Sequence, residues 1–231
     1  MNPKHTRIFR SVLAVGAALG LSACASVNSV DSNAYYDTAS RAAPVTSSLN
    51  APVASVAPVA LANFKVVAVN VSVPQSLRVS EANRYYPSGD IVWREDPIGN
   101  RHAQVDAIVT AGLTQGVAGF AGEREVVLDV VVTRFHALTE KARYTIGGVH
   151  AIQFEMTIRD AETGEILMAS RPIKADFDAL GGRTAVAAEA RGITQKVRIT
   201  NHLAFVIQQE LGGPNGYTAR DNGLIGAINQ L

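Results

Sequence analysis

Apolar and polar residues alternate where the first regular element of the chain is expected. Four valines at every second position, from Val67 to Val73, are separated by smaller or polar residues. A period of two is typical of a strand with one buried face, and Pro74, which has no amide hydrogen, ends it. Residues 90–95 predict a second, short strand, closed by the turn-forming residues that follow.

Two later segments have a helical period. After Arg101, apolar residues recur every three or four positions as far as Phe120, although Gly112, Gly116 and Gly119 lower the helix propensity of this segment. The same spacing runs from Ile193 to Leu211 and stops at Gly212-Gly213-Pro214. The pattern therefore predicts two helices, the second preceded by helical or loop residues from position 184.

Three strands are predicted between these helices. Residues 125–138 are rich in valine on both faces, which is typical of an interior strand. Residues 152–158 alternate strictly, and residues 165–177 return after a turn at 160–164 that contains Gly164. The last two strands should form an antiparallel hairpin.

The order of these elements predicts an α+β fold: a two-layer domain with a mainly antiparallel sheet and two helices packed on one face. We expect one domain at residues 63–213. Residues 214–231 form a C-terminal tail with apolar residues at loosely helical spacing, such as Leu224 and Ile228. The tail is expected to dock on the domain, with binding to a partner as the alternative.

The N-terminus has the pattern of an export signal. Three basic residues, among them Lys4 and Arg10, precede an apolar run from Val12 to Leu21 that is too short to span a bilayer permanently. This run ends in Leu-Ser-Ala-Cys, with the chain's only cysteine at Cys24. We interpret residues 1–23 as a lipoprotein signal peptide; the alternative is an ordinary secretory signal with a chance cysteine.

The Leu-Ser-Ala-Cys tetrapeptide resembles the substrate of the bacterial lipoprotein-processing pathway. That resemblance implies that Cys24 carries acyl chains such as palmitate, and more than one chain holds a protein stably at a membrane. The next residue, Ala25, is not the aspartate that the resemblance associates with retention at the inner membrane. The expected location is therefore the cell envelope, at the outer membrane and facing the periplasm.

Residues 24–62 then predict a flexible tether. They consist mostly of Ala, Ser, Val, Pro, Asn and Thr and bury too little apolar surface to offset the entropy lost on ordering. An extended edge segment at residues 52–58 is the alternative.

Charge and cysteine content narrow the classes of partner. Removal of residues 1–23 takes three basic residues from 21, which leaves 18 basic against 20 acidic residues. A basic surface is the usual footprint of nucleic-acid binding, so we expect no nucleic-acid partner. With Cys24 acylated, no cysteine is left for a disulfide. The membrane, through the lipid anchor, and an envelope protein are the expected partners.

The sequence offers no strong catalytic signature. No Gly-x-Ser-x-Gly elbow or phosphate-binding glycine loop occurs, and we expect no cofactor and no metal. His136 and His150 fall on neighbouring predicted strands, so an envelope hydrolase or metal-dependent enzyme using this pair is one alternative. Single strand histidines are more often structural, and the expected class is not an enzyme.

One irregular segment has the composition of a contact surface. Residues 85–96 contain Tyr85, Tyr86, the only tryptophan, Trp93, and Arg94, all residue types enriched at interfaces. The alternative, which we favour, is that Trp93 covers the edge of the core while Arg94 pairs with a nearby carboxylate.

Several stretches resemble a family of uncharacterised lipoproteins from alphaproteobacteria related to Rhodobacter. They are residues 71–77, 91–97, 134–137, 148–150 and 189–200. More loosely, the first valine strand, the Ile-Val-Trp-Arg segment, the helix after it and the valine-rich strand are similar to auxiliary lipoproteins of envelope lipid-transport systems. That likeness implies a non-catalytic partner of a larger transport assembly.

Together these observations predict a membrane-anchored lipoprotein that faces the periplasm and acts as a binding or accessory component of an envelope assembly or transport system. A lipid-binding carrier with an apolar cavity between helices and sheet is a further alternative.

Overall fold

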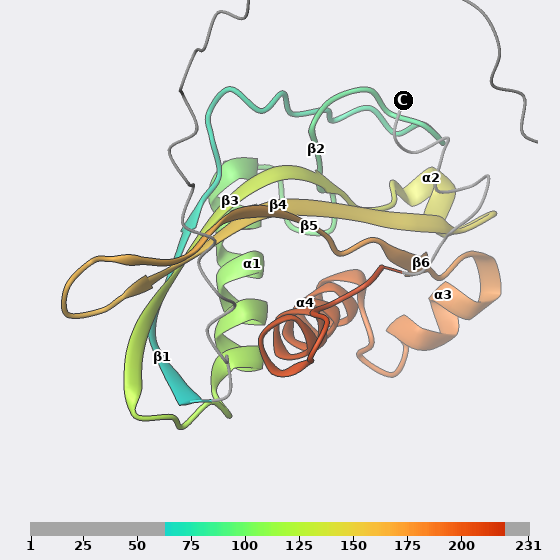
Figure 1. Cartoon of the computed structure of the whole chain (residues 1–231). Helices are drawn as coiled ribbons and strands as arrows, with labels where there is room; N and C mark the ends of the chain where they lie inside the picture. Colours follow the sequence, from blue (N-terminus) through green and yellow to red (C-terminus); the bar gives the residue numbers. More distant parts are fainter. Residues whose placement is uncertain (1–62, 220–231) are drawn as a thin grey trace, which may run out of the picture. The chain divides into compact units, whose positions relative to one another are not determined.

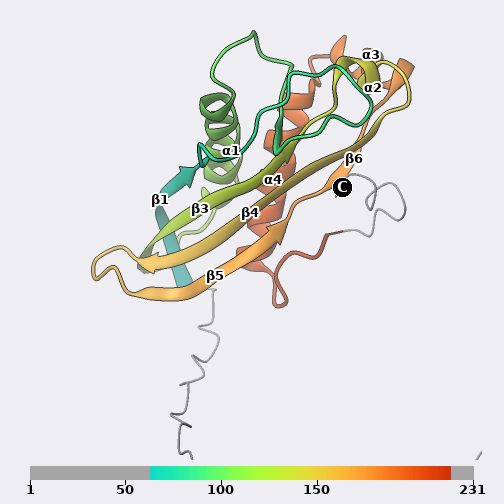
Figure 2. The same cartoon turned by 90° about the horizontal axis from the view of Figure 1, so that it is seen from above.

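The computed structural model describes residues 63–219 as a sheet with helices (Figures 1 and 2). The main path of the sheet runs in the order β1-β3-β4-β5, with β2 beside β3 and β6 beside β4. The strands are β1 (Phe64–Ser72), β2 (Ile91–Val92), β3 (Arg124–His136), β4 (Gly148–Asp160), β5 (Ile166–Lys174) and β6 (Phe177–Ala179).

The predicted α+β class is confirmed, and the sheet is mixed. The pairs β3–β4, β4–β5 and β4–β6 are antiparallel, whereas β1 and β2 each run parallel to β3. Parallel neighbours need a crossover connection, and here helix α1 (Arg101–Val117) carries the chain back between β1 and β3. Alternation of side chains reveals a strand but not its direction, which explains why the parallel pairs escaped the sequence analysis.

The predicted hairpin is confirmed as β4 and β5. Asp160 closes its turn, because the Oδ1 atom accepts hydrogen bonds from the backbone N–H groups of Glu162 at 3.0 Å and Thr163 at 2.9 Å. Gly164 has a φ of 73°, a left-handed conformation that favours glycine. The turn chemistry visible in the sequence therefore sets the register of the two strands.

Helices α1 and α4 (Gln195–Gly212) lie on the same face of the sheet, as predicted (Figure 1). Each begins at a side-chain cap: Asn100 accepts a hydrogen bond from the N–H of Ala103, and Thr194 from that of Val197. The described residues contain two further, shorter helices, α2 (Glu140–Arg143) and α3 (Gly182–Glu189).

The glycines of α1 lie where this helix approaches α4. A Cβ atom at Gly116 would be 2.3 Å from the carbonyl oxygen of Ala204, and one at Gly112 would be 2.8 Å from the Cβ of Leu203. Nothing lies within 4 Å of the corresponding position at Gly119. The loss of helix propensity at Gly112 and Gly116 is therefore the cost of close packing between the two helices.

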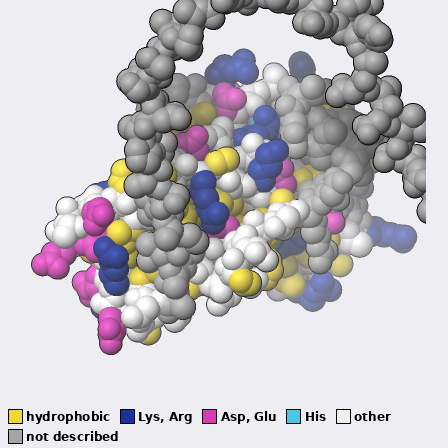
Figure 3. All heavy atoms as spheres, viewed as in Figure 1, with side chains coloured by type: hydrophobic (Ala, Val, Ile, Leu, Met, Phe, Trp, Pro, Cys, Tyr) yellow, Lys and Arg dark blue, Asp and Glu magenta, His cyan; other side chains and the backbone are white. Residues whose placement is uncertain are grey.

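The core lies between the sheet and these two helices. Its largest fully buried side chains include Phe154 and Ile158 of β4, Leu113 of α1, and Leu203 and Ile207 of α4. Within the described part of the chain, no helix combines the length and the apolar content needed to cross a bilayer. On the face shown in Figure 3, acidic and basic side chains of the described residues are interspersed.

Candidate functional site

The structure places Trp93 in the core rather than at a contact surface. Its side chain is 0% exposed, packs edge-on against Phe135 with 5.9 Å between ring centroids, and donates a hydrogen bond from Nε1 to Asp96 Oδ2 at 2.8 Å. A buried indole with a satisfied N–H is a structural element. The interpretation of Trp93 as a partner contact is therefore wrong, and the alternative of a core residue holds.

Arg94 likewise serves the fold. Its Nε donates to Glu140 at 2.6 Å and its Nη1 to the backbone carbonyl of Glu81, so it links the first residue of α2 to the loop at Glu81. Tyr85 and Tyr86, in contrast, are 38% and 60% exposed. Only these two tyrosines of the predicted contact segment present a large side-chain surface to solvent.

His136 and His150 do not converge. In the β3–β4 pairing His136 lies opposite Ala151, so His150, the residue before Ala151, projects from the other face of the sheet. His136 contacts Gly89 O through Nε2 at 2.8 Å, whereas His150 lies against the ring of Phe177. The geometry gives no site that uses both imidazoles. Within residues 63–219, no group of three or more His, Cys, Asp or Glu side chains is placed to hold a metal ion.

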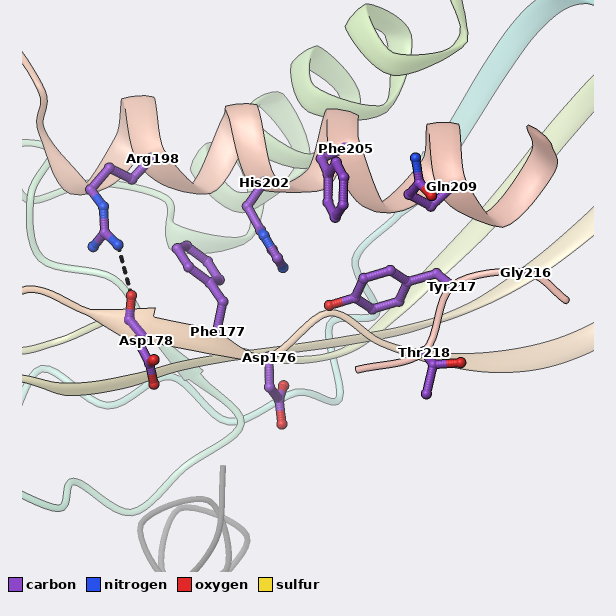
Figure 4. A pocket seen from close by; sticks show the side chains of 10 residues that line it. All are labelled: Asp176, Phe177, Asp178, Arg198, His202, Phe205, Gln209, Gly216, Tyr217 and Thr218. Atoms are coloured by element: carbon purple, nitrogen blue, oxygen red, sulfur yellow. Dashed lines mark hydrogen bonds between the residues drawn. The ribbon is translucent and has the colours of Figure 1, made fainter. Parts of the chain in front are cut away.

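A pocket of about 460 Å³ lies between α4, β6 and the segment that follows α4 (Figure 4). Arg198, His202, Phe205 and Gln209 line it from α4. Gly216, Tyr217 and Thr218 line it from the segment after the helix, and β6 with the residue before it supplies the remaining wall. Its volume lies within the roughly 300–1,000 Å³ that is usual for small-molecule sites. It is the candidate functional site.

Aromatic rings form one side of this pocket. Phe177 stacks on His202 with 4.0 Å between ring centroids, and Tyr217 stands at 80° to His202 and at 90° to Phe205. Phe205 is 50% exposed, a large fraction for a phenylalanine on a packed helix. Figure 4 shows that Phe205 and His202 project from α4 toward the strand and Tyr217. The rings therefore offer an accessible apolar surface.

The polar groups of the pocket differ in charge. Arg198 donates from Nη2 to the backbone carbonyl of Asp178 at 2.7 Å, and its guanidinium lies 5.3 Å from the ring centroid of Phe177. Burial, together with the positive charge of Arg198, lowers the pKa of His202 to about 4, so His202 is neutral at pH 7. Burial also lowers the pKa of His150, behind Phe177, to about 3.

Sequence reasoning missed this site, although its signal was present. Arg198, His202, Phe205 and Gln209 are spaced by four, three and four residues, and they share one face of α4. The opposite face carries the apolar residues that identified the helix. A second, aromatic and polar face on a core helix is the feature that would have indicated the pocket. Cys24, the predicted lipidation site, lies outside the described residues.

Residues 64–227 match the sequence profile of DUF6778, a family of unknown function. The chain belongs to the DUF6778 family. The match begins at the first residue of β1 and extends beyond α4, so it contains the whole pocket. No curated protein matches the chain.

Solved structures similar to the DUF6778 chain include three from bacteria. A DUF330 protein from Xanthomonas campestris is 13% identical, with 62% of this chain and 83% of that chain covered and a TM-score of 0.35. A predicted lipoprotein from Caulobacter crescentus is 16% identical, with coverage of 46% and 79% and a TM-score of 0.26. The PelC dodecamer from Paraburkholderia phytofirmans is 16% identical, with coverage of 62% and 87% and a TM-score of 0.24.

Proposed function

We propose that this DUF6778 protein is a non-catalytic binding protein of the cell envelope, which recognises its partner or ligand through the pocket between α4 and β6. The observation that carries the proposal is the accessible aromatic side of that pocket, where Phe205 and Tyr217 line the same cavity as the guanidinium of Arg198. Accessible aromatic side chains and an arginine within one pocket are typical of binding surfaces.

The arrangement of the other polar groups favours binding over catalysis. His202, the titratable base of the pocket, stacks on Phe177, and its pKa of about 4 leaves it a poor proton acceptor at neutral pH. Asp176 is fixed as well, since its Oδ1 accepts the backbone N–H of Ile152 at 2.9 Å. We therefore assign these groups to shaping the pocket rather than to proton transfer.

The location in the proposal comes from the sequence. The sequence has a basic segment, an apolar run and a Leu-Ser-Ala-Cys tetrapeptide that ends at Cys24. These features support export, acylation and attachment at the outer membrane, facing the periplasm. The resemblance to lipoproteins of the Rhodobacter group supports the same location. The looser resemblance to auxiliary lipoproteins of lipid-transport systems supports an accessory role in such an assembly.

Affinity capture from membranes tests the proposal. The tagged full chain is solubilised in several mild detergents, and proteins retained with it are identified by mass spectrometry. We expect a specific set of envelope proteins or a co-purifying ligand with the wild type and loss of that set with Phe205→Ala.

The matched control is Ile166→Ala, because Ile166 is also exposed, at 60%, but lies on the β4–β5 hairpin away from the pocket. Recovery of the bait alone in every detergent would contradict the proposal. So would equal loss of the captured set with both variants.

A further inference from the structure

Arg198 differs from four other arginines that the fold buries at least in part. Arg94, Arg101, Arg143 and Arg171 each lie within 4.0 Å of at least one carboxylate. Arg198 is partly buried too, yet no carboxylate of the described residues lies within that distance. Its polar contact is the carbonyl of Asp178, so most of its N–H donors have no acceptor among residues 63–219.

A partly buried guanidinium without an ion-pair partner bears a desolvation cost that its surroundings offset only in part. Burial lowers the pKa of Arg198, and the negative charge of Asp178 opposes this shift only in part. The cation–π contact with Phe177 compensates only in part. An anion bound in the pocket would supply the missing partner, and guanidinium matches oxyanions in a bidentate geometry.

Neither aspartate that lines the pocket forms an ion pair with Arg198, although the charge of Asp178 acts on the guanidinium from a greater distance. Figure 4 shows that the carboxylates of Asp176 and Asp178 extend away from α4, whereas Arg198, His202 and Phe205 project from α4 toward the strand. Asp176 is also committed to the backbone of β4 through Ile152. The pocket therefore presents a cation and neutral aromatic rings on its α4 side.

We propose that the pocket binds an amphipathic oxyanion, with the anionic group on Arg198 and a single apolar chain or ring against Phe205 and Tyr217. This inference rests on the proposed binding function of the same pocket and names the chemistry of its ligand. A carboxylate and a phosphate headgroup share the required chemistry. His202, neutral at pH 7, adds a polar ring nitrogen beside the anion without adding a charge.

The test uses residues 24–231 carrying Cys24→Ser, so that neither an acyl chain nor detergent competes for the pocket. Dodecanoate, dodecyl phosphate and the neutral dodecyl maltoside are titrated below their micelle concentrations, and binding is followed by calorimetry at low and high salt. We expect one or both anions to bind and the neutral glycoside to bind at least tenfold more weakly. Binding of dodecanoate alone identifies a carboxylate, and binding of dodecyl phosphate alone identifies a phosphate headgroup.

Variants assign the binding to the pocket. Arg198→Gln should weaken binding of the anion at least tenfold and remove the salt dependence of that binding. Phe205→Ala should lower the affinity for the anions and for the glycoside alike. The control Arg191→Gln removes an exposed arginine outside the pocket and should leave affinity unchanged. Equal affinity for dodecyl maltoside, no binding of either anion, or unchanged affinity in Arg198→Gln would overturn the inference.

Membrane capture with Arg198→Gln separates this inference from the proposed function. If the wild type and Arg198→Gln retain the same envelope proteins while neither anion binds the wild type, the inference fails and the proposed binding function stands. If the wild type retains nothing, the proposed function itself fails.

Discussion

The carboxylate of Glu95 accepts a hydrogen bond from the backbone N–H of Gln195 at 3.1 Å, across 100 residues of sequence. Its second oxygen accepts the N–H of Lys196 at 2.6 Å. Glu95 thus satisfies free amide groups in the first turn of α4 and places a negative charge at the positive end of the helix dipole. Arg143, the last residue of α2, forms an ion pair with the same carboxylate, with 2.9 Å between its Nη2 atom and Glu95 Oε1.

Glu95→Ala should therefore destabilise the fold. The substitution leaves Arg143, whose side chain is 8% exposed, with one carboxylate fewer and leaves two helix N–H groups without acceptors. Removal of one partner from a buried ion pair costs about 3 kcal/mol or more. Urea unfolding followed by circular dichroism measures this loss.

Glu125→Ala is the control for charge removal at the surface. Glu125 pairs with Lys65 at 3.0 Å, but both side chains are more than half exposed, and such pairs contribute less than about 1 kcal/mol. If Glu95→Ala is no more destabilising than Glu125→Ala, Glu95 does not anchor α4.

The contact between α1 and α4 gives a second prediction. Gly116→Ala places a methyl group 2.3 Å from Ala204 O, so the helices must separate, and we expect a loss of about 1–3 kcal/mol in the free energy of unfolding. Gly119→Ala, whose Cβ would lie in open space, should leave stability unchanged or raise it slightly. Thermal and urea unfolding of both variants make the comparison, and equal stability of the two would show that the helices are not in contact at Gly116.

Much of the fold could be predicted because its strands and long helices are periodic. The valines of β1 and the alternation in β4 indicated these strands directly, and the turn at Asp160 predicted their hairpin. Helix α2 and strand β6 escaped because four and three residues carry no detectable period. The direction of β1 escaped because a parallel and an antiparallel strand have the same alternation.

The candidate site was less predictable, for a physical reason. Composition identifies residue types that interfaces favour, but it does not distinguish an exposed tryptophan from one such as Trp93, whose N–H is satisfied inside the core by Asp96. To predict the pocket from the sequence, one would have to recognise that α4 has a second functional face besides its apolar one. It also required Phe177 and Tyr217, which only the tertiary fold brings to His202.

The lipoprotein prediction is tested at Cys24. Cys24→Ser removes the sulfur that would carry the lipid, so the protein should be released from the membrane fraction or remain unprocessed. The fold of residues 64–211 should persist, because Cys24 lies outside the described domain. Fractionation with labelling by a palmitate analogue measures the anchor, and circular dichroism measures the fold. An unchanged membrane fraction would refute the lipoprotein interpretation.

The buried histidines predict a loss of stability in acid. Burial lowers the pKa of His136 and of His202 to about 4 and that of His150 to about 3, whereas each has a pKa near 6.5 in the unfolded chain. Between these values the unfolded chain binds protons that the folded protein does not. The free energy of unfolding should therefore fall as the pH drops from about 6.5 toward 4, by an amount on the order of a few kcal/mol.

His150→Leu assigns part of this slope to one residue. Both ring nitrogens of His150 are buried without a hydrogen-bond partner in the described part of the chain, so an apolar side chain removes a group that resists protonation in the fold. Urea midpoints measured from pH 7.5 to 4 should show a shallower decline for His150→Leu than for the wild type. An unchanged slope in His150→Leu would show that His150 binds its proton equally well in the folded and the unfolded chain. That result would be incompatible with its burial against Phe177.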